Sequence, residues 1–198
     1  MRYDKGHKEE TRQRIIDAAA KRFREDGVAS AGVAGLMADA GLTNGAFYAH
    51  FDSKEDLLRA ALVQAHDKRK EAMQAARARG DDPEVWIRAY LSPRHRDNPG
   101  TGCLVSTLAA EIARHPHKTR EVFALGVAEF IDLVAAELPG GTAETRLRDA
   151  TALYAMLVGT LQLARAVGDM ELSDQILERG ISAALASFHR SEESRGPR

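Results

Sequence analysis

Hydrophobic positions recur along most of this chain at intervals of three and four residues. Near the N-terminus, Ile15, Ile16, Ala19 and Phe23 share one side of a predicted helix, which Gly27 ends. We find no segment in which apolar and polar residues alternate as they do in a half-buried strand. The pattern therefore predicts an all-α protein of about nine helices.

Capping residues and helix breakers divide the chain into successive helices. Thr11 is expected to cap the first helix and Ser53 the fourth, where Asp56 completes a capping box. Two prolines and two glycines between Ser92 and Gly102 predict a loop. The helices expected after the first cover residues 33–40, 44–50, 54–79, 83–90, 103–114, 116–138, 143–167 and 173–188.

The second and third predicted helices are short and are joined by a tight turn. Gly41 stands where the chain must turn, in a left-handed conformation that is cheap only for glycine. Leu42 can pack beneath that turn. Such a pair forms a helix-turn-helix, in which the second helix enters the major groove of DNA with its first residues at the base edges.

The charge of this segment is low for a surface that binds DNA. The whole chain has a net charge of −1, and from Gly27 to Phe51 the only formal charge is Asp39. Residues 1–24 carry a net charge of +4, from eight basic and four acidic side chains. We therefore expect positive charge beside the helix that reads the bases rather than on it, with helix N-termini adding phosphate binding.

A family resemblance covers about Thr11 to Leu58, which includes TRQRIIDAAAKRFREDG and VAGLMADAGLTNGAFYAHFDSKEDLL. These stretches resemble the N-terminal DNA-binding domain of the TetR family of bacterial transcriptional regulators. The resemblance implies an Ω-shaped homodimer whose C-terminal domains dimerise through the last two helices and hold a ligand pocket. The expected division is a DNA-binding domain at 1–57, a ligand-binding and dimerisation domain at 58–190, and a disordered tail at 191–198.

By this resemblance the chain is a cytoplasmic regulator, expected to be a repressor that a small-molecule inducer releases from a palindromic operator. Two copies of the third helix would enter successive major grooves of double-stranded DNA, about 34–36 Å apart. No enzymatic activity, cofactor or metal is expected, and His115 and His117 are interpreted as surface residues. The longest uncharged run has 15 residues, whereas a membrane span needs about 20, so no membrane partner is expected.

The residues expected to contact DNA lie in and beside the helix-turn-helix. By resemblance, Tyr48 and Lys54 would contact phosphate, while Thr43 and Asn44 cap the third helix or read base edges. Phe47 is expected in the core, as is Phe51. The full set proposed for DNA is Arg12, Ser30, Gly32, Thr43, Asn44, Gly45, Ala46, Tyr48, His50 and Lys54.

The ligand-binding set is built around Cys103, the only cysteine. Two interpretations of it stay open. A free cysteine is usually a small buried hydrophobe, but a helix N-terminus can lower a thiol pKa, and GCL before an alanine-rich helix resembles TetR-type regulators that sense electrophiles or oxidants. The residues proposed to bind ligand are Cys103, Thr107, Phe123, Phe130, Tyr154, Gln162 and Arg165.

Two other functions stay open at this stage. An all-α adaptor could keep a degenerate head that no longer binds DNA, because Ala31, Gly32 and Ala46 stand where relatives often carry threonine or serine. An enzyme could use Cys103 as nucleophile and His115 or His117 as base, although no nucleophile-elbow or cofactor motif supports it.

Overall fold

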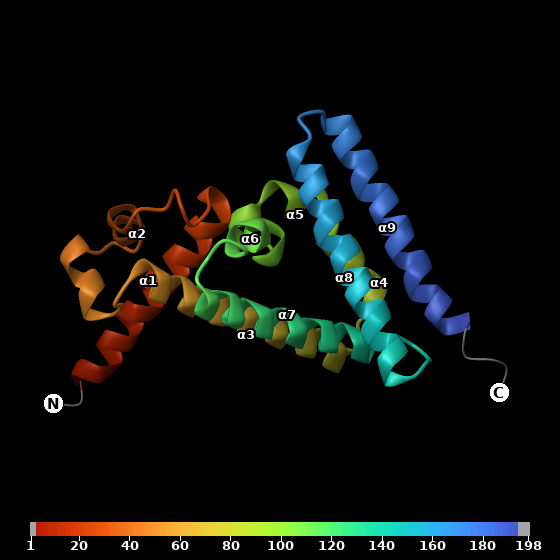
Figure 1. Ribbon diagram of the computed structural model, residues 1–198, viewed down its shortest axis with the longest axis horizontal. Coiled ribbons are helices and arrows are strands. Elements are labelled where there is room, and N and C mark those ends of the chain that lie inside the picture. Colours follow the sequence, from red (N-terminus) through yellow and green to blue (C-terminus); the bar gives the residue numbers. More distant parts are fainter. Residues whose placement is uncertain (1–2, 194–198) are drawn as a thin grey trace.

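The computed structural model describes the backbone of residues 3–193 and the side chains of residues 6–188, and between residues 3 and 193 it contains helices and connecting turns only (Figure 1). This confirms the all-α fold. The elements are α1 (Tyr3–Asp26), α2 (Val33–Asp39), the 3-10 helix η1 (Asn44–Ala49), α3 (Lys54–Arg79), α4 (Pro83–Tyr90), α5 (Pro93–Asp97), the 3-10 turn η2 (Pro99–Thr101), α6 (Val105–Ile112), α7 (His117–Glu137), α8 (Ala143–Ala166) and α9 (Met170–Glu193).

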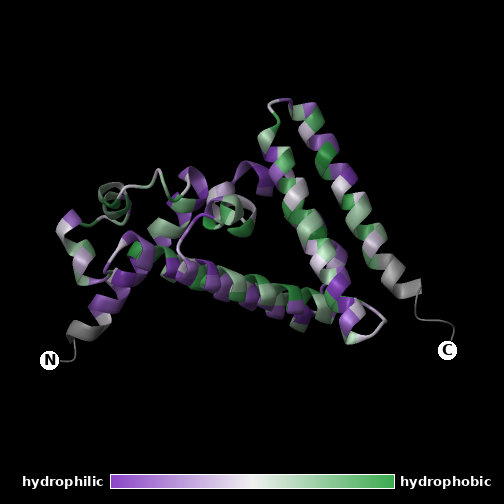
Figure 2. Ribbon diagram, viewed as in Figure 1, coloured by the Kyte–Doolittle hydropathy of each residue, from purple (hydrophilic) through white to green (hydrophobic). Residues whose placement is uncertain are grey.

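The helices are arranged as an arch. A head of α1, α2 and η1 lies at one end, and α8 and α9 pack as a pair at the other (Figure 1). The long helices α3 and α7 run side by side between them, and α6 contacts both α1 and α8. Hydrophobic residues dominate α6 and α8, whereas α1 is largely hydrophilic (Figure 2). The short helix α6 therefore links the head to the far pair.

Two hydrophobic cores hold the arch together. The head core includes Phe23, Phe47 and Phe51, and α6 contributes Leu108 to it. The first turns of α3 also belong to this core, so the expected domain boundary at 57/58 lies inside a continuous helix and stays a prediction. The second core joins α4 to α9 and includes Phe130. No helix within residues 3–193 combines the length and apolar character that a membrane crossing requires.

The first helix is longer than its apolar pattern indicates. It begins at Tyr3, so Thr11 is not its N-cap. Instead, the Thr11 hydroxyl donates to the carbonyl of His7, 2.8 Å away and one turn earlier in the same helix. The polar first turns carry no hydrophobic periodicity, which is why the sequence did not reveal them. The expected cap at Ser53 is confirmed, because its Oγ accepts a hydrogen bond from the N–H of Asp56 at 3.1 Å.

The expected loop at Ser92–Gly102 is also partly helical, and the prediction of a loop was wrong there. Ser92 caps α5 by accepting from the N–H of His95, and Pro93 occupies the first turn. Proline fits this position because its missing N–H has no helical partner there. The prolines therefore start short helices here.

The last helix exceeds its expected bounds at both ends. It begins at Met170 rather than at residue 173, because the Asp169 carboxylate accepts from the N–H groups of Glu171 and Leu172. It continues to Glu193, so residues 191–193 of the expected disordered tail are helical. Residues 194–198 lie outside the described residues.

Candidate functional site

The turn between α2 and η1 is built as the sequence predicts. Gly41 has a φ of +67°, in the left-handed region. Leu42 packs against the head core. Phe47 and Phe51 are 1% and 2% exposed, which confirms both as core residues. Because these two rings pack into the head core, the opposite side of η1 lies at the surface.

That surface carries most of the residues proposed to read DNA. Thr43, Asn44 and Gly45 are exposed at the start of η1, and Tyr48 is 74% exposed. The Tyr48 ring packs edge-on against Phe47, with 5.2 Å between centroids. Thr43 occupies the N-cap position, but its side chain makes no capping hydrogen bond.

Ala46, also proposed for DNA, is half-buried and packs against the head core. Before α2, Ser30 and Gly32 are both exposed. Gly32 is the N-cap of α2 and offers no side chain to its first turn. The expectation that backbone N–H groups or Ser30 act here, in place of a capping threonine, remains a proposal.

Lys54 has a structural role that the sequence did not indicate. Its ammonium donates to the carbonyl oxygens of Val28 at 2.9 Å and Ala31 at 3.2 Å. These two bonds fix the loop between α1 and α2 to the start of α3. One ammonium proton is left for a phosphate, so the proposed DNA contact and the structural contact are compatible.

Positive charge gathers beside η1 in a small hollow lined by Lys8, Glu9, Arg12, Ala49 and His50. The Arg12 guanidinium lies 4.9 Å from the centroid of the Phe51 ring, a cation–π contact that fixes it next to η1. The buried Nδ1 of His50 has no hydrogen-bond partner among the described residues. Burial, then the charges of Lys8 and Arg12, lower the pKa of His50. The two cations, Lys8 and Arg12, are thus available for phosphate.

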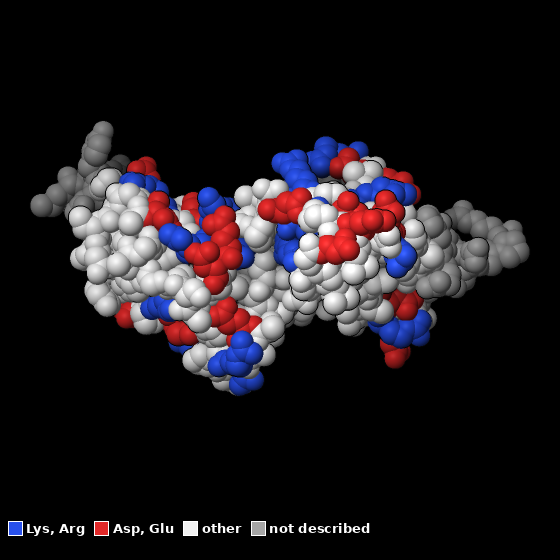
Figure 3. Space-filling view, turned by 90° about the horizontal axis from the view of Figure 1, so that it is seen from above, with Lys and Arg blue, Asp and Glu red and all other residues white. Residues whose placement is uncertain are grey.

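The acidic residue of α2 is paired with an arginine of α1. Asp39, the only formal charge from Gly27 to Phe51, accepts two hydrogen bonds from Arg22, at 2.8 and 3.1 Å. On the face of the molecule shown in Figure 3, basic and acidic side chains are interspersed, and neither sign covers it. The head therefore offers local positive charge without a strong field over the whole molecule.

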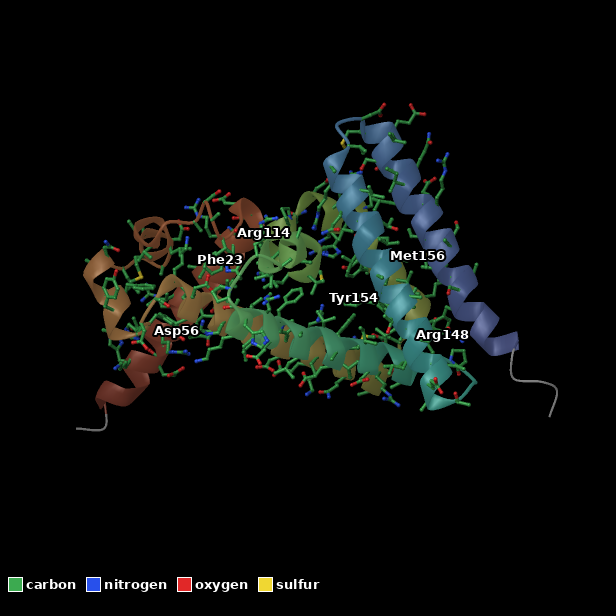
Figure 4. The ribbon with its side chains drawn as sticks, in the orientation of Figure 1. Phe23, Asp56, Arg114, Arg148, Tyr154 and Met156 are labelled. Atoms are coloured by element: carbon green, nitrogen blue, oxygen red, sulfur yellow. The ribbon has the colours of Figure 1, made fainter. Side chains whose placement is uncertain are left out.

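A second candidate site is a cavity of about 500 Å³ among α1, α3, α4, α7 and the segment from η2 to Leu104. Of the residues proposed for ligand, Cys103 and Phe130 line it, and Tyr154 lies directly behind them, with its ring centroid 4.8 Å from that of Phe130. Figure 4 shows Tyr154 on the side of α8 that faces α7. Residues absent from the expected set also line it, chiefly Arg24, His66, Arg69, Trp86 and Tyr90.

The other proposed ligand residues do not line this cavity. The Thr107 hydroxyl donates to the carbonyl of Leu104 in its own helix, and Phe123 packs edge-on against His66. Gln162 is half-buried on α8. Arg165 donates to the carbonyl oxygens of His95 and Arg96 and to Ser106 Oγ, and so ties α8 to α5 and α6.

Arg69 is the central polar group of the cavity. Its guanidinium stacks 4.0 Å from the centroid of Phe130 and donates to the Tyr154 hydroxyl at 2.6 Å and the Gly126 carbonyl at 3.2 Å. It forms no ion pair with a carboxylate among the described side chains. Arg69 Nη1 lies 3.6 Å from the sulfur of Cys103. Burial raises the pKa of that thiol, but the Arg69 charge helps to outweigh burial, and the pKa lies below its ordinary value.

His66 is held in one tautomer by Arg69. The guanidinium lies 3.4 Å from His66 Nδ1, and because arginine only donates, Nδ1 must accept. Neutral His66 then carries its proton on Nε2, which is buried and has no partner among the described residues. Burial and the charge of Arg69 lower the pKa of His66 to about 4. At neutral pH this is an uncharged donor without an acceptor.

We expect this histidine to make the protein less stable in acid. The unfolded chain binds a proton below the ordinary pKa of 6.5, whereas folded His66 does not until about 4, so the free energy of unfolding falls as pH decreases between these values. The loss from His66 is about 2 kcal/mol between pH 7 and pH 5. Denaturant unfolding measured at both values checks it. His66→Leu should reduce this slope, and an equal slope in both proteins would contradict the assignment.

His95 fixes the backbone of Cys103. Its Nδ1 donates to the carbonyl of Tyr90 at 2.7 Å, and its Nε2 accepts from the N–H of Cys103 at 2.8 Å. Both bonds require the neutral ring, and burial lowers the pKa of His95 accordingly. The sequence offered no sign of this bridge between α4 and the start of α6.

The cavity wall is bonded to the head. Arg24 of α1 lines the cavity and donates to the carbonyl of Gly100 at 2.8 Å. On α6, the Glu111 carboxylate accepts from the N–H groups of Val28 and Ala29, at 2.9 and 2.7 Å. A change in the position of η2 or α6 would therefore act directly on the loop that precedes α2.

His115 adds a further link, and its interpretation as a surface residue was wrong. Its side chain is 13% exposed and bonds to Glu55 at 2.7 Å, and Thr119 donates to the same carboxylate. His117 is at the surface, with its side chain 76% exposed and paired with Glu121. Neither histidine is bonded to Cys103, so the geometry gives no support to a Cys–His catalytic pair.

Comparison with known proteins agrees with the interpretation of the head. The profile described as "Bacterial regulatory proteins, tetR family" matches residues 15–61. The HTH-type transcriptional regulator TtgR of Pseudomonas putida is 36% identical over 92 residues, which are 46% of this chain and 44% of that protein. The chain thus matches less than half the length of this curated relative.

Solved structures extend the similarity over most of the chain. A TetR-family transcriptional regulator from Streptomyces coelicolor superposes with a TM-score of 0.66 at 26% identity, covering 91% of this chain and 96% of that one. The reduced form of NemR from E. coli gives a TM-score of 0.74 at 21% identity, covering 88% and 95%. At that identity the likeness to NemR is one of fold.

Proposed function

We propose that the chain is a member of the TetR family of bacterial regulatory proteins and a DNA-binding transcriptional regulator, a cytoplasmic repressor that a small-molecule inducer releases from a palindromic operator. The observation that carries the proposal is the exposed side of η1, free of acidic charge and flanked by the basic hollow at Arg12 and His50. Residues on η1 meet base edges, and the hollow holds phosphate.

The proposed dimer forms through α8 and α9. Leu147 and Leu163 on α8 are 45% and 61% exposed, and Leu172 at the start of α9 is 42% exposed. Large apolar side chains on two adjacent helices favour burial against a second copy. Such a dimer places two heads on one side of a near-palindromic operator, about one helical turn of DNA apart.

Ligand control follows from the contacts between the cavity and the head. A molecule in the cavity presses on the segment from η2 to α6, which Arg24 and Glu111 bind to α1 and to the loop after it. If an inducer binds more tightly to the conformation in which this segment is displaced, it increases the fraction of protein in that conformation. In that conformation the spacing of the two heads no longer fits the operator.

Sensing through Cys103 is a narrower form of this proposal. It is supported by the lowered pKa of the thiol beside Arg69 and by the position of Cys103 in the cavity wall. The test measures how much of the wild-type protein and of the Cys103→Ser variant is released from operator DNA by a quinone. If both proteins respond alike, the thiol is a structural residue of the wall.

Footprinting on the DNA upstream of the chain's own gene tests the main proposal. Asn44→Ala should change which bases are preferred, whereas Lys8→Ala should weaken binding to all sequences and lower the slope of log K against log salt by about one. Arg88→Ala, on the exposed side of α4, is the matched loss of a cation outside the head. Absence of any specific footprint at low salt would favour an adaptor with a degenerate head.

A further inference from the structure

The polar groups of the cavity share one property: those without partners are donors. Trp86 Nε1 and His66 Nε2 are buried without a hydrogen-bond partner within residues 6–188, and both residues line the cavity, as does Tyr90, whose hydroxyl lies beside the Cys103 thiol. An indole N–H only donates, and the bond from Arg69 leaves the proton of His66 on Nε2. A buried donor without an acceptor costs about 1–3 kcal/mol, so a ligand with acceptor oxygens would relieve both costs at once.

The charge of the lining has the same sign throughout. Arg24, Lys68 and Arg69 line the cavity, and no aspartate or glutamate does. Lys68 is paired with Asp17, but neither arginine is paired with a carboxylate among the described side chains. Arg69 contacts the Cys103 sulfur, the Tyr154 hydroxyl, the Gly126 carbonyl and two aromatic rings. A cationic ligand would meet two positive charges that have no carboxylate partner among the described side chains, whereas an anionic ligand would neutralise them.

The remaining walls are apolar. Alanine side chains of α3 and α4 line it together with Met73, Leu104 and Phe130. A volume of about 500 Å³ is typical of sites for small molecules, which lie near 300–1,000 Å³. We therefore expect the body of the ligand to be largely hydrophobic.

We propose that the cavity binds an organic carboxylate with an apolar body, whose carboxylate pairs with Arg69. This deepens the proposed function by giving the chemical class of the inducer. Arg69 can pair with a carboxylate in the bidentate geometry that guanidinium groups favour. The buried donors of His66 and Trp86 line the same cavity and can add hydrogen bonds to the ligand, and the alanine-rich wall covers its body.

The only tryptophan of the chain, Trp86, reports on binding by its fluorescence. The probes are two acids, 4-phenylbutyrate and decanoate, each with its amide and its amine, so that shape is kept while charge changes. We expect at least one acid to bind at least about tenfold tighter than its amide, the ratio that one charge-assisted hydrogen bond provides. The amines should bind most weakly.

Arg69→Met keeps the length of the side chain and removes the charge, so it should bring the ratio of acid to amide affinity close to one. Arg88→Met is the matched control on the exposed side of α4 and should leave the ratio unchanged. Arg69→Lys guards against misfolding, since it should fold and retain a preference for the acid. If wild-type protein binds neither acid tighter than its amide, the carboxylate proposal is wrong. A specific operator footprint in that protein would leave the regulator proposal standing.

Discussion

Glu111→Ala is expected to lower the free energy of unfolding by about 3 kcal/mol, because two backbone N–H groups lose their charged acceptor and such bonds contribute about 1.5–3 kcal/mol each. The carboxylate reaches from α6 to Val28 and Ala29, in the loop between α1 and α2. The same change should weaken the effect of an inducer on DNA binding, since the head would no longer follow α6. Chemical unfolding and ligand-dependent operator binding measure the two effects separately.

Matched control variants separate the contribution of this carboxylate to stability from its contribution to ligand control. Glu111→Gln keeps one acceptor oxygen, so its loss of stability should be about half that of the alanine variant. Glu71→Ala removes an exposed acid from α3 and should change neither quantity by more than about 0.5 kcal/mol. If Glu111→Ala responds to inducer as the wild type does, coupling must travel through other contacts, of which Arg24 to Gly100 is the first to test.

Features of the head that depend on neighbouring residues were predictable from sequence. A glycine that must adopt positive φ, a serine cap three residues before its partner N–H, and aromatic rings at helical spacing each act within one or two turns. The contacts of Lys54 could not be predicted in this way. Its charge suggested phosphate, but its acceptors are carbonyl oxygens 23 and 26 residues away, and backbone oxygens carry no sequence signal.

The cavity was only partly predictable for the same reason. Cys103 and Phe130 were expected from residue type alone, while Arg69 reads as one more charge on a long polar helix. Arg69 becomes a candidate binding group because it lies beside Phe130 and Tyr154 in the fold. Tyr154 is 85 residues away from Arg69 in the sequence. The same holds for Glu111, which accepts hydrogen bonds from the N–H groups of Val28 and Ala29, 83 and 82 residues away in the sequence. The roles of Arg69 and Glu111 both depend on contacts between residues far apart in the sequence, and the local sequence pattern does not reveal such contacts.

Gly126→Ala should destabilise the protein although alanine is the better helix former. A Cβ at this position of α7 would lie 2.1–2.2 Å from three ring atoms of His66 on α3, far inside contact distance. Overpacking of this kind costs about 3 kcal/mol or more, which exceeds the gain of about 1 kcal/mol from helix propensity. Gly35→Ala is the matched control in α2, where the added Cβ would meet only Arg22, at an ordinary 3.9 Å.

A double-mutant cycle separates this clash from other effects of the substitution. His66→Ala removes the ring, so in that background Gly126→Ala should cost nothing or stabilise, with a coupling energy of about 2–3 kcal/mol measured by chemical unfolding. The close approach of α3 to α7 also places the Gly126 carbonyl 3.2 Å from Arg69. Gly126→Ala should therefore displace Arg69 as well and weaken acid binding at Trp86, whereas additive stabilities in the cycle would show that α3 and α7 do not pack through this histidine.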